Sequence, residues 1–131
     1  RILFQYHGAE HKAVSCREAK KPLTVKNVQS FSTKHPRCGT SFIIFVFLIA
    51  ILVFTLVSVE INFFALFFIR FLLIFPIAGI SYEILKYSAL MRNQYFFKFI
   101  IAPGMWFQGI TTNEPTNKQV EVSIAALKKV L

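Results

Sequence analysis

The chain contains no aspartate and only two cysteines among its 131 residues. Two cysteines are too few for a disulfide framework, and both lie in a basic segment that the charge pattern assigns to the cytoplasm, so we expect reduced thiols that pack or bind metal. The sequence also lacks a signal-peptide pattern, an internal repeat, a low-complexity tract and a glycine-rich loop that could cradle phosphate. These absences exclude a disulfide-stabilised scaffold and a nucleotide site built on such a loop.

Apolar residues, by contrast, are in large excess. Hydrophobic residue types make up 55% of the chain, 16 residues are phenylalanine, and the mean hydropathy is +0.55. A chain of one domain's length cannot bury so much apolar surface in a single core, whereas a bilayer can accommodate it. The composition therefore predicts an all-α integral membrane protein.

The basic residues lie on either side of an almost uncharged block. Of the 15 Lys and Arg, eight fall within residues 1–38 and six after residue 85, and Arg70 alone lies between them. This distribution follows the positive-inside rule and predicts that both termini are cytoplasmic. It also favours contact with anionic lipid headgroups, and it accounts for the net charge of +9 without nucleic acid as a partner.

Two apolar runs predict a transmembrane helical hairpin over residues 41–85. Residues 41–59 carry no charge and are long enough to cross a hydrocarbon core of about 30 Å as a helix. The second run extends from Phe63 to about Tyr82 and follows so closely that a tight turn must join the two. Within it, we expect Arg70 to extend to the outer interface or to form an ion pair in a larger bundle.

The segment before the hairpin, residues 1–40, is polar and basic and is predicted to form a cytoplasmic helical cap. A helix over residues 4–20 should end before Pro22, because proline disfavours a helical residue before it. Thr24 is a good N-cap for a short second helix, which should end at His35 for the same reason.

The segment after the hairpin, residues 86–131, contains two further elements. Residues 95–107 are rich in aromatic side chains but too short and interrupted to span, so they are expected to lie at the membrane interface. From Thr116 the pattern predicts an amphipathic C-terminal helix. Its apolar face would consist of Val120, Ile124, Leu127 and Leu131.

The cap begins with the pattern "HGAEH", in which His7 and His11 stand one helical turn apart with Glu10 beside them. His-x-x-Glu-His is the inverted zincin pattern, in which two imidazoles bind zinc and the glutamate acts as a base on the metal-bound water. We therefore predict a zinc site with both histidines as ligands and Glu10 as a catalytic residue. The alternative interpretation is the polar face of a helix at the headgroup layer.

Such a site needs further ligands, and the connector "HPRCGTS" supplies two candidates, His35 and Cys38. Together with the two histidines of the first helix, they would close a tetrahedral, structural site. Glu18 shares the histidine face, but the helical rise places it roughly 10 Å from His11, too far to share one ion without a break in the helix. If one ligand is left out, or is replaced by Glu83 at the cytoplasmic end of the second span, the site has an open position and is catalytic. The sequence leaves this choice open.

Six blocks of the chain, in order, resemble the YqhQ-like family of bacterial membrane proteins of unknown function: "FQYHGAEHK", "LTVKNV", "HPRCGTSF", "GISYEILK", "APGMWFQ" and "EPTNKQVEVSIAAL". The resemblance covers essentially the whole chain, and it implies a metal-dependent enzyme in the plasma membrane of a bacterium or in a membrane of bacterial origin. Without assigning roles, it points to His7, Glu10, His11, Glu18, His35, Cys38 and Glu83. Family members carry a further N-terminal half, so the chain resembles their C-terminal half. We expect such an N-terminal half, or a partner subunit, to complete the protein.

Two functions from different classes fit these features. The first is a zinc-dependent membrane hydrolase at the cytoplasmic face, with Glu10 and Glu83 as the candidate catalytic carboxylates. The second is a non-catalytic membrane subunit whose basic cap binds another membrane protein in a larger complex. The substrate, the reaction and the partner do not follow from the sequence.

Overall fold

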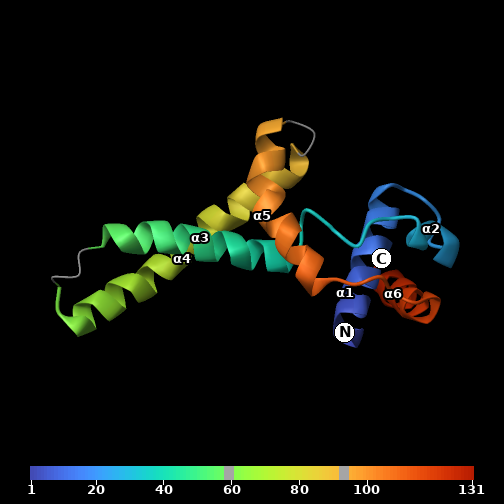
Figure 1. The fold of residues 1–131 in the computed structure, drawn as a ribbon, viewed down its shortest axis with the longest axis horizontal. Helices are drawn as coiled ribbons and strands as arrows, with labels where there is room; N and C mark the ends of the chain where they lie inside the picture. Colours follow the sequence, from blue (N-terminus) through green and yellow to red (C-terminus); the bar gives the residue numbers. More distant parts are fainter. Residues whose placement is uncertain (58–60, 92–94) are drawn as a thin grey trace. The chain divides into compact units, whose positions relative to one another are not determined.

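The computed structural model describes residues 1–57, 61–91 and 95–131, and all of its regular elements are α-helices (Figure 1). The chain divides into two compact units, residues 1–35 together with 105–131, and residues 36–104. In chain order the helices are α1 (Ile2–Glu18), α2 (Val25–Gln29), α3 (Gly39–Leu56), α4 (Phe63–Leu90), α5 (Tyr95–Thr111) and α6 (Asn117–Lys129). The first unit thus joins the two ends of the chain.

The core of the first unit forms where α1, α2 and α6 pack together. Its buried side chains recur at helical spacing along α1 and α6, so that each helix turns one apolar face inward. These residues are Ala9, Ala13, Cys16, Val28, Val120 and Ile124. The apolar face of the C-terminal helix is therefore covered by protein rather than by lipid, except that Leu131 lies beyond α6 and is exposed.

The helix ends of the first unit follow local capping chemistry. The Thr24 side chain accepts a hydrogen bond from the Asn27 N–H at the start of α2, and Thr116 forms a capping box with Gln119 at the start of α6. α2 ends at Gln29, so the prediction that this helix continues to His35 is wrong. The backbone N–H groups of Ser30 and Phe31 donate hydrogen bonds to carbonyls three residues earlier, and these bonds end the helix several residues before Pro36.

In the second unit, α3 and α4 lie side by side and run in opposite directions (Figure 1). Gly39–Leu56 and Phe63–Ser88 are long and apolar enough to cross a membrane, and the second extends beyond the predicted run. Many of their large apolar side chains point outward, as expected of helices whose solvent is lipid, among them Phe47, Leu52, Phe64 and Leu72. The predicted tight turn falls on residues 58–60, which lie outside the described residues.

Two contacts between helices mark the second unit. The Arg70 guanidinium lies 5.5 Å from the centre of the Phe54 ring, a cation–π contact between α4 and α3, and within the described residues its Nε has no hydrogen-bond partner. A Cβ at Gly104 would approach Ser41 Cβ to 2.7 Å, so α5 and α3 can be this close only because residue 104 is glycine. The predicted interfacial segment is part of α5, which is a continuous helix through Pro103.

Candidate metal centre

Helix α1 places His7 and His11 on one face, as their spacing requires. The centres of the two imidazole rings are 4.4 Å apart, and the rings meet edge to face at 64°. His11 is buried, with 4% of its surface exposed, and His7 is half-buried. A buried imidazole is a polar group that needs hydrogen-bond partners.

Each of these imidazoles forms a hydrogen bond with a backbone carbonyl from a different part of the first unit. His7 Nδ1 lies 2.9 Å from the Thr111 carbonyl oxygen, at the end of α5, and His11 Nδ1 lies 2.6 Å from the Thr33 carbonyl oxygen. A carbonyl oxygen can only accept a hydrogen bond, so Nδ1 is the protonated nitrogen in both rings. In the neutral rings, Nε2 therefore carries the lone pair, which is the state that a metal ligand requires.

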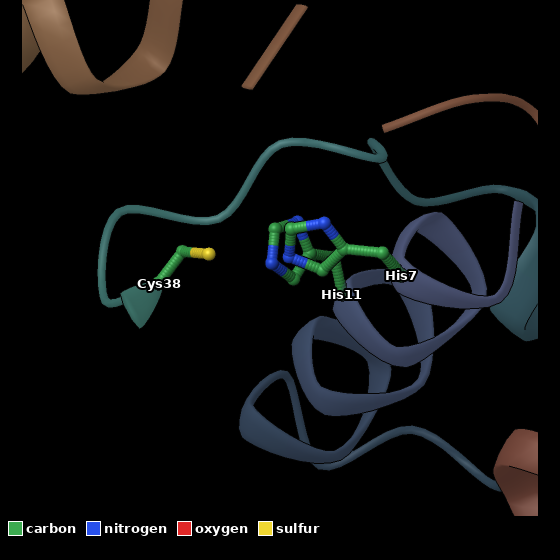
Figure 2. Close-up of side chains that lie close together, drawn as sticks. All are labelled: His7, His11 and Cys38. Atoms are coloured by element: carbon green, nitrogen blue, oxygen red, sulfur yellow. The ribbon is translucent and has the colours of Figure 1, made fainter. Parts of the chain in front are cut away.

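A thiol completes a group of three ligand atoms. The side chains of His7, His11 and Cys38 each offer one atom, and these three atoms all lie within 4.8 Å of one another (Figure 2). Cys38 is the N-cap of α3, where its Sγ accepts a hydrogen bond from the Thr40 N–H at 3.4 Å. N–H donors at a helix N-terminus stabilise a thiolate, the form that binds metal. The group could hold a metal ion.

His35 and Glu18, two further candidates from the sequence, contact each other. His35 Nε2 lies 3.2 Å from Glu18 Oε2, and the His35 ring centre is 5.9 Å from that of His11. The Gln108 side chain holds the His35 backbone on both sides, since Oε1 accepts from the N–H and Nε2 donates to the carbonyl, each at 2.8 Å. Among the described residues, the close group of three does not include His35 or Glu18.

The two carboxylates predicted to be catalytic lie elsewhere. Glu10 is exposed and lines a groove of about 450 Å³ between α1 and α6, together with Tyr6, Val14 and Val122. Glu83 belongs to the second unit, where it forms an ion pair with Lys86 at 3.3 Å, one helical turn away on α4. Neither belongs to the close group of ligand atoms found among the described residues, so their catalytic roles stay predictions.

The residues that hold the imidazoles could not be found from the sequence. Thr33 and Thr111 act through their backbone carbonyls, which every residue has, so their side chains give no signal. Gln108 belongs to a block that supports the family resemblance, "APGMWFQ", but a lone glutamine has no pattern of its own. Cys16, the other thiol, is fully buried in the core, and burial raises its pKa.

Comparisons with known proteins agree with the resemblance seen in the sequence. The model of a family described as "Protein of unknown function (DUF1385)" matches residues 1–131. The chain is 41% identical over 129 residues to the "Uncharacterized protein YqhQ" of Bacillus subtilis (strain 168), a match that covers 98% of this chain and 40% of that protein. The chain thus spans less than half the length of this relative. No solved structure matches the chain. It belongs to the YqhQ-like family of proteins of unknown function.

Proposed function

We propose that the chain is the metal-binding part of a membrane protein, and that His7, His11 and Cys38 bind one zinc ion at the cytoplasmic face. The observation that carries this proposal is the fixed tautomer of the two histidines. Both rings donate from Nδ1 to backbone carbonyls, so in the neutral rings Nε2 is the acceptor. Each ring offers one nitrogen within 4.8 Å of the other ligand atoms. Imidazole nitrogen and thiolate sulfur are the donors that zinc prefers.

Covalent connectivity supports Cys38 as the third ligand. His35 belongs to the first unit, where Gln108 and Glu18 hold it, and Cys38 follows three residues later. Three residues of extended chain reach at most about 11 Å, so Cys38 cannot move far from the histidine face. Cys16 does not compete, because its thiol faces the carbonyl oxygens of Lys21 and Pro22 in the core.

Three protein ligands leave a fourth position for water or substrate, which is the arrangement of catalytic zinc sites. While its Nε2 contacts Glu18, His35 could close the site only through Nδ1. The proposal therefore includes a zinc-dependent hydrolase, in which the metal would serve as a Lewis acid. The placement of Glu10 in the groove between α1 and α6 instead favours the second candidate, a non-catalytic subunit whose cap is stabilised by zinc.

The direct test is the metal content of the purified full chain, measured by elemental analysis after zinc has been offered. We expect about one zinc per chain. The His7→Ala/His11→Ala variant should lose it, Cys38→Ser should bind more weakly, and the matched control Cys16→Ala should keep it. With cobalt in place of zinc, the thiolate-to-cobalt absorption should vanish in Cys38→Ser and persist in Cys16→Ala. Folded wild-type protein that binds no metal would overturn the proposal.

Glu10→Gln separates the two candidates. A hydrolase that uses this carboxylate should keep its zinc and lose turnover of ester or amide substrates presented in bilayers. A subunit should keep both its zinc and its ability to assemble. Turnover that is unchanged in Glu10→Gln but lost with the zinc would assign the base to another residue.

The membrane location and topology are also part of the proposal. Two helices of sufficient length and apolar character support insertion, and the basic residues on both flanks support cytoplasmic termini in a bacterial plasma membrane. We propose anionic headgroups as the lipid contact and, as protein partner, either the remainder of a longer polypeptide or a separate membrane subunit. A C-terminal alkaline phosphatase fusion should be inactive and a fluorescent protein fusion should be bright; the reverse pattern would contradict the topology.

A further inference from the structure

Gln108 is one of the most deeply buried polar side chains of the first unit, with none of its surface exposed. Its two hydrogen bonds to the His35 backbone, both 2.8 Å long, reproduce the pairing that one strand of a sheet would offer another. A buried amide is stable only when both its donor and its acceptor are satisfied. The pair therefore fixes the backbone of His35 against the end of α5.

His35 ends the N-terminal part of the first unit, and the connector to Cys38 starts there. Pro36 restricts the direction in which the chain leaves, because a proline has a fixed φ and disfavours helical backbone in the residue before it. Glu18 holds the His35 ring at the same time. With both its backbone and its ring held, His35 is a fixed origin for the three residues that lead to Cys38.

The same end of α5 also holds one of the imidazoles. Thr111, three residues after Gln108, provides the carbonyl that binds His7 Nδ1, and the Thr112 hydroxyl donates to the Gln108 carbonyl at 2.7 Å. One short stretch of helix thus fixes the tautomer of a ligand histidine and the start of the connector that carries the ligand cysteine.

We propose that Gln108 is a positioning residue of the metal site, which raises the affinity for zinc by holding the connector that presents Cys38. This inference rests on the proposed zinc site and adds to it a residue that does not touch the metal. Groups outside the ligand set typically change metal affinity by about 10–100-fold when they are removed.

The test compares the zinc affinity of the full chain in detergent or nanodiscs, by competition with a chromophoric chelator, for wild type, Gln108→Met and Gln119→Met. Gln119 is a matched control, since it is a buried glutamine of the same unit whose bonds go to Gln5 and Thr116. We expect Gln108→Met to bind zinc about 10–100-fold more weakly, with reduced thiolate-to-cobalt absorption at saturating cobalt. Gln119→Met should stay close to wild type in both measurements, even if its stability falls.

Each outcome decides something different. If wild type binds no zinc, the proposed function itself fails. If wild type binds zinc and Gln108→Met binds it equally well, or if both variants weaken it equally, Gln108 has no positioning role. If Gln108→Met does not fold, Gln108→Glu decides, because its carboxylate keeps an acceptor for the His35 N–H, has no donor for the His35 carbonyl and adds a negative charge. Unchanged affinity in Gln108→Glu would then overturn the inference.

Discussion

Gly8 and Gly109 should respond in opposite directions to the same substitution, alanine. Both lie within helices of the first unit, where alanine is favoured over glycine by about 1 kcal/mol. A Cβ at Gly8, however, would collide with the backbone carbonyl oxygen of Asn113 and would lie 3.2 Å from Thr33 Cγ2. A Cβ at Gly109 would meet only the flexible end of Lys34, at 3.8 Å.

The magnitude follows from these contacts. To restore an ordinary separation, the Asn113 carbonyl would have to withdraw by roughly 1 Å. Overpacking of this kind costs about 1–3 kcal/mol, and strain on the 2.9 Å hydrogen bond from the Asn113 N–H to the Phe4 carbonyl adds about 1 kcal/mol. After the gain in helix propensity, Gly8→Ala should lower the free energy of unfolding by about 1–3 kcal/mol. Gly109→Ala should raise it by about 1 kcal/mol.

Thermal unfolding of the full chain in detergent, followed by circular dichroism, measures the difference. For a unit of about 60–100 residues, 1 kcal/mol corresponds to a shift of about 4–8 °C in the midpoint. Asn113 is two residues from the Thr111 carbonyl that binds His7, so Gly8→Ala should also weaken zinc binding. If Gly8→Ala raised the midpoint as Gly109→Ala does, the close approach of α1 to residue 113 would be wrong.

Three further predictions concern single side chains of the first unit. Lys20 has φ 55°, just after α1, so Lys20→Gly should stabilise the protein by about 1 kcal/mol, seen as a higher thermal midpoint; a lower midpoint would contradict this backbone geometry. Lys12 is buried and pairs with the largely exposed Glu114 at 2.8 Å. Glu114→Gln leaves the buried Lys12 charge without this partner, so it should lower the free energy of unfolding more than Lys12→Met does. In the Lys12→Met background, Glu114→Gln should leave the free energy of unfolding unchanged. Because burial raises the pKa of the Cys16 thiol, iodoacetamide should modify Cys16 only on unfolding, as mass spectrometry would show; rapid modification of folded protein would place Cys16 outside the core.

Local patterns in the sequence were enough to find most of the helices and two of the candidate ligands. The two apolar runs identified α3 and α4, because length and hydropathy alone decide whether a helix can cross a bilayer. Thr24 and Thr116 marked the starts of α2 and α6, because a cap is made within four residues. The spacing of His7 and His11 placed them on one face, because the helical repeat leaves no other arrangement.

Contacts between distant segments were decided only by the tertiary structure. The sequence could not show that residues 105–131 pack on residues 1–35, since the apolar face of α6 would suit a membrane surface as well as a protein core. It named His35 and Glu18 separately but not their contact, and it gave no sign of Gln108. It also placed Glu10 beside the histidines, whereas in the structure Glu10 is exposed and lines the groove between α1 and α6.

The sequence by itself therefore determined most of the helical elements, the two long apolar helices and the pair of histidines, because each depends on residues within a few turns of one another. The tertiary structure decided which nitrogen of each histidine donates to a backbone carbonyl. That choice depends on the carbonyls of Thr33 and Thr111, which reach the rings only after the two ends of the chain have folded together. Backbone carbonyls are the same in every residue, so no residue pattern could have predicted these two hydrogen bonds.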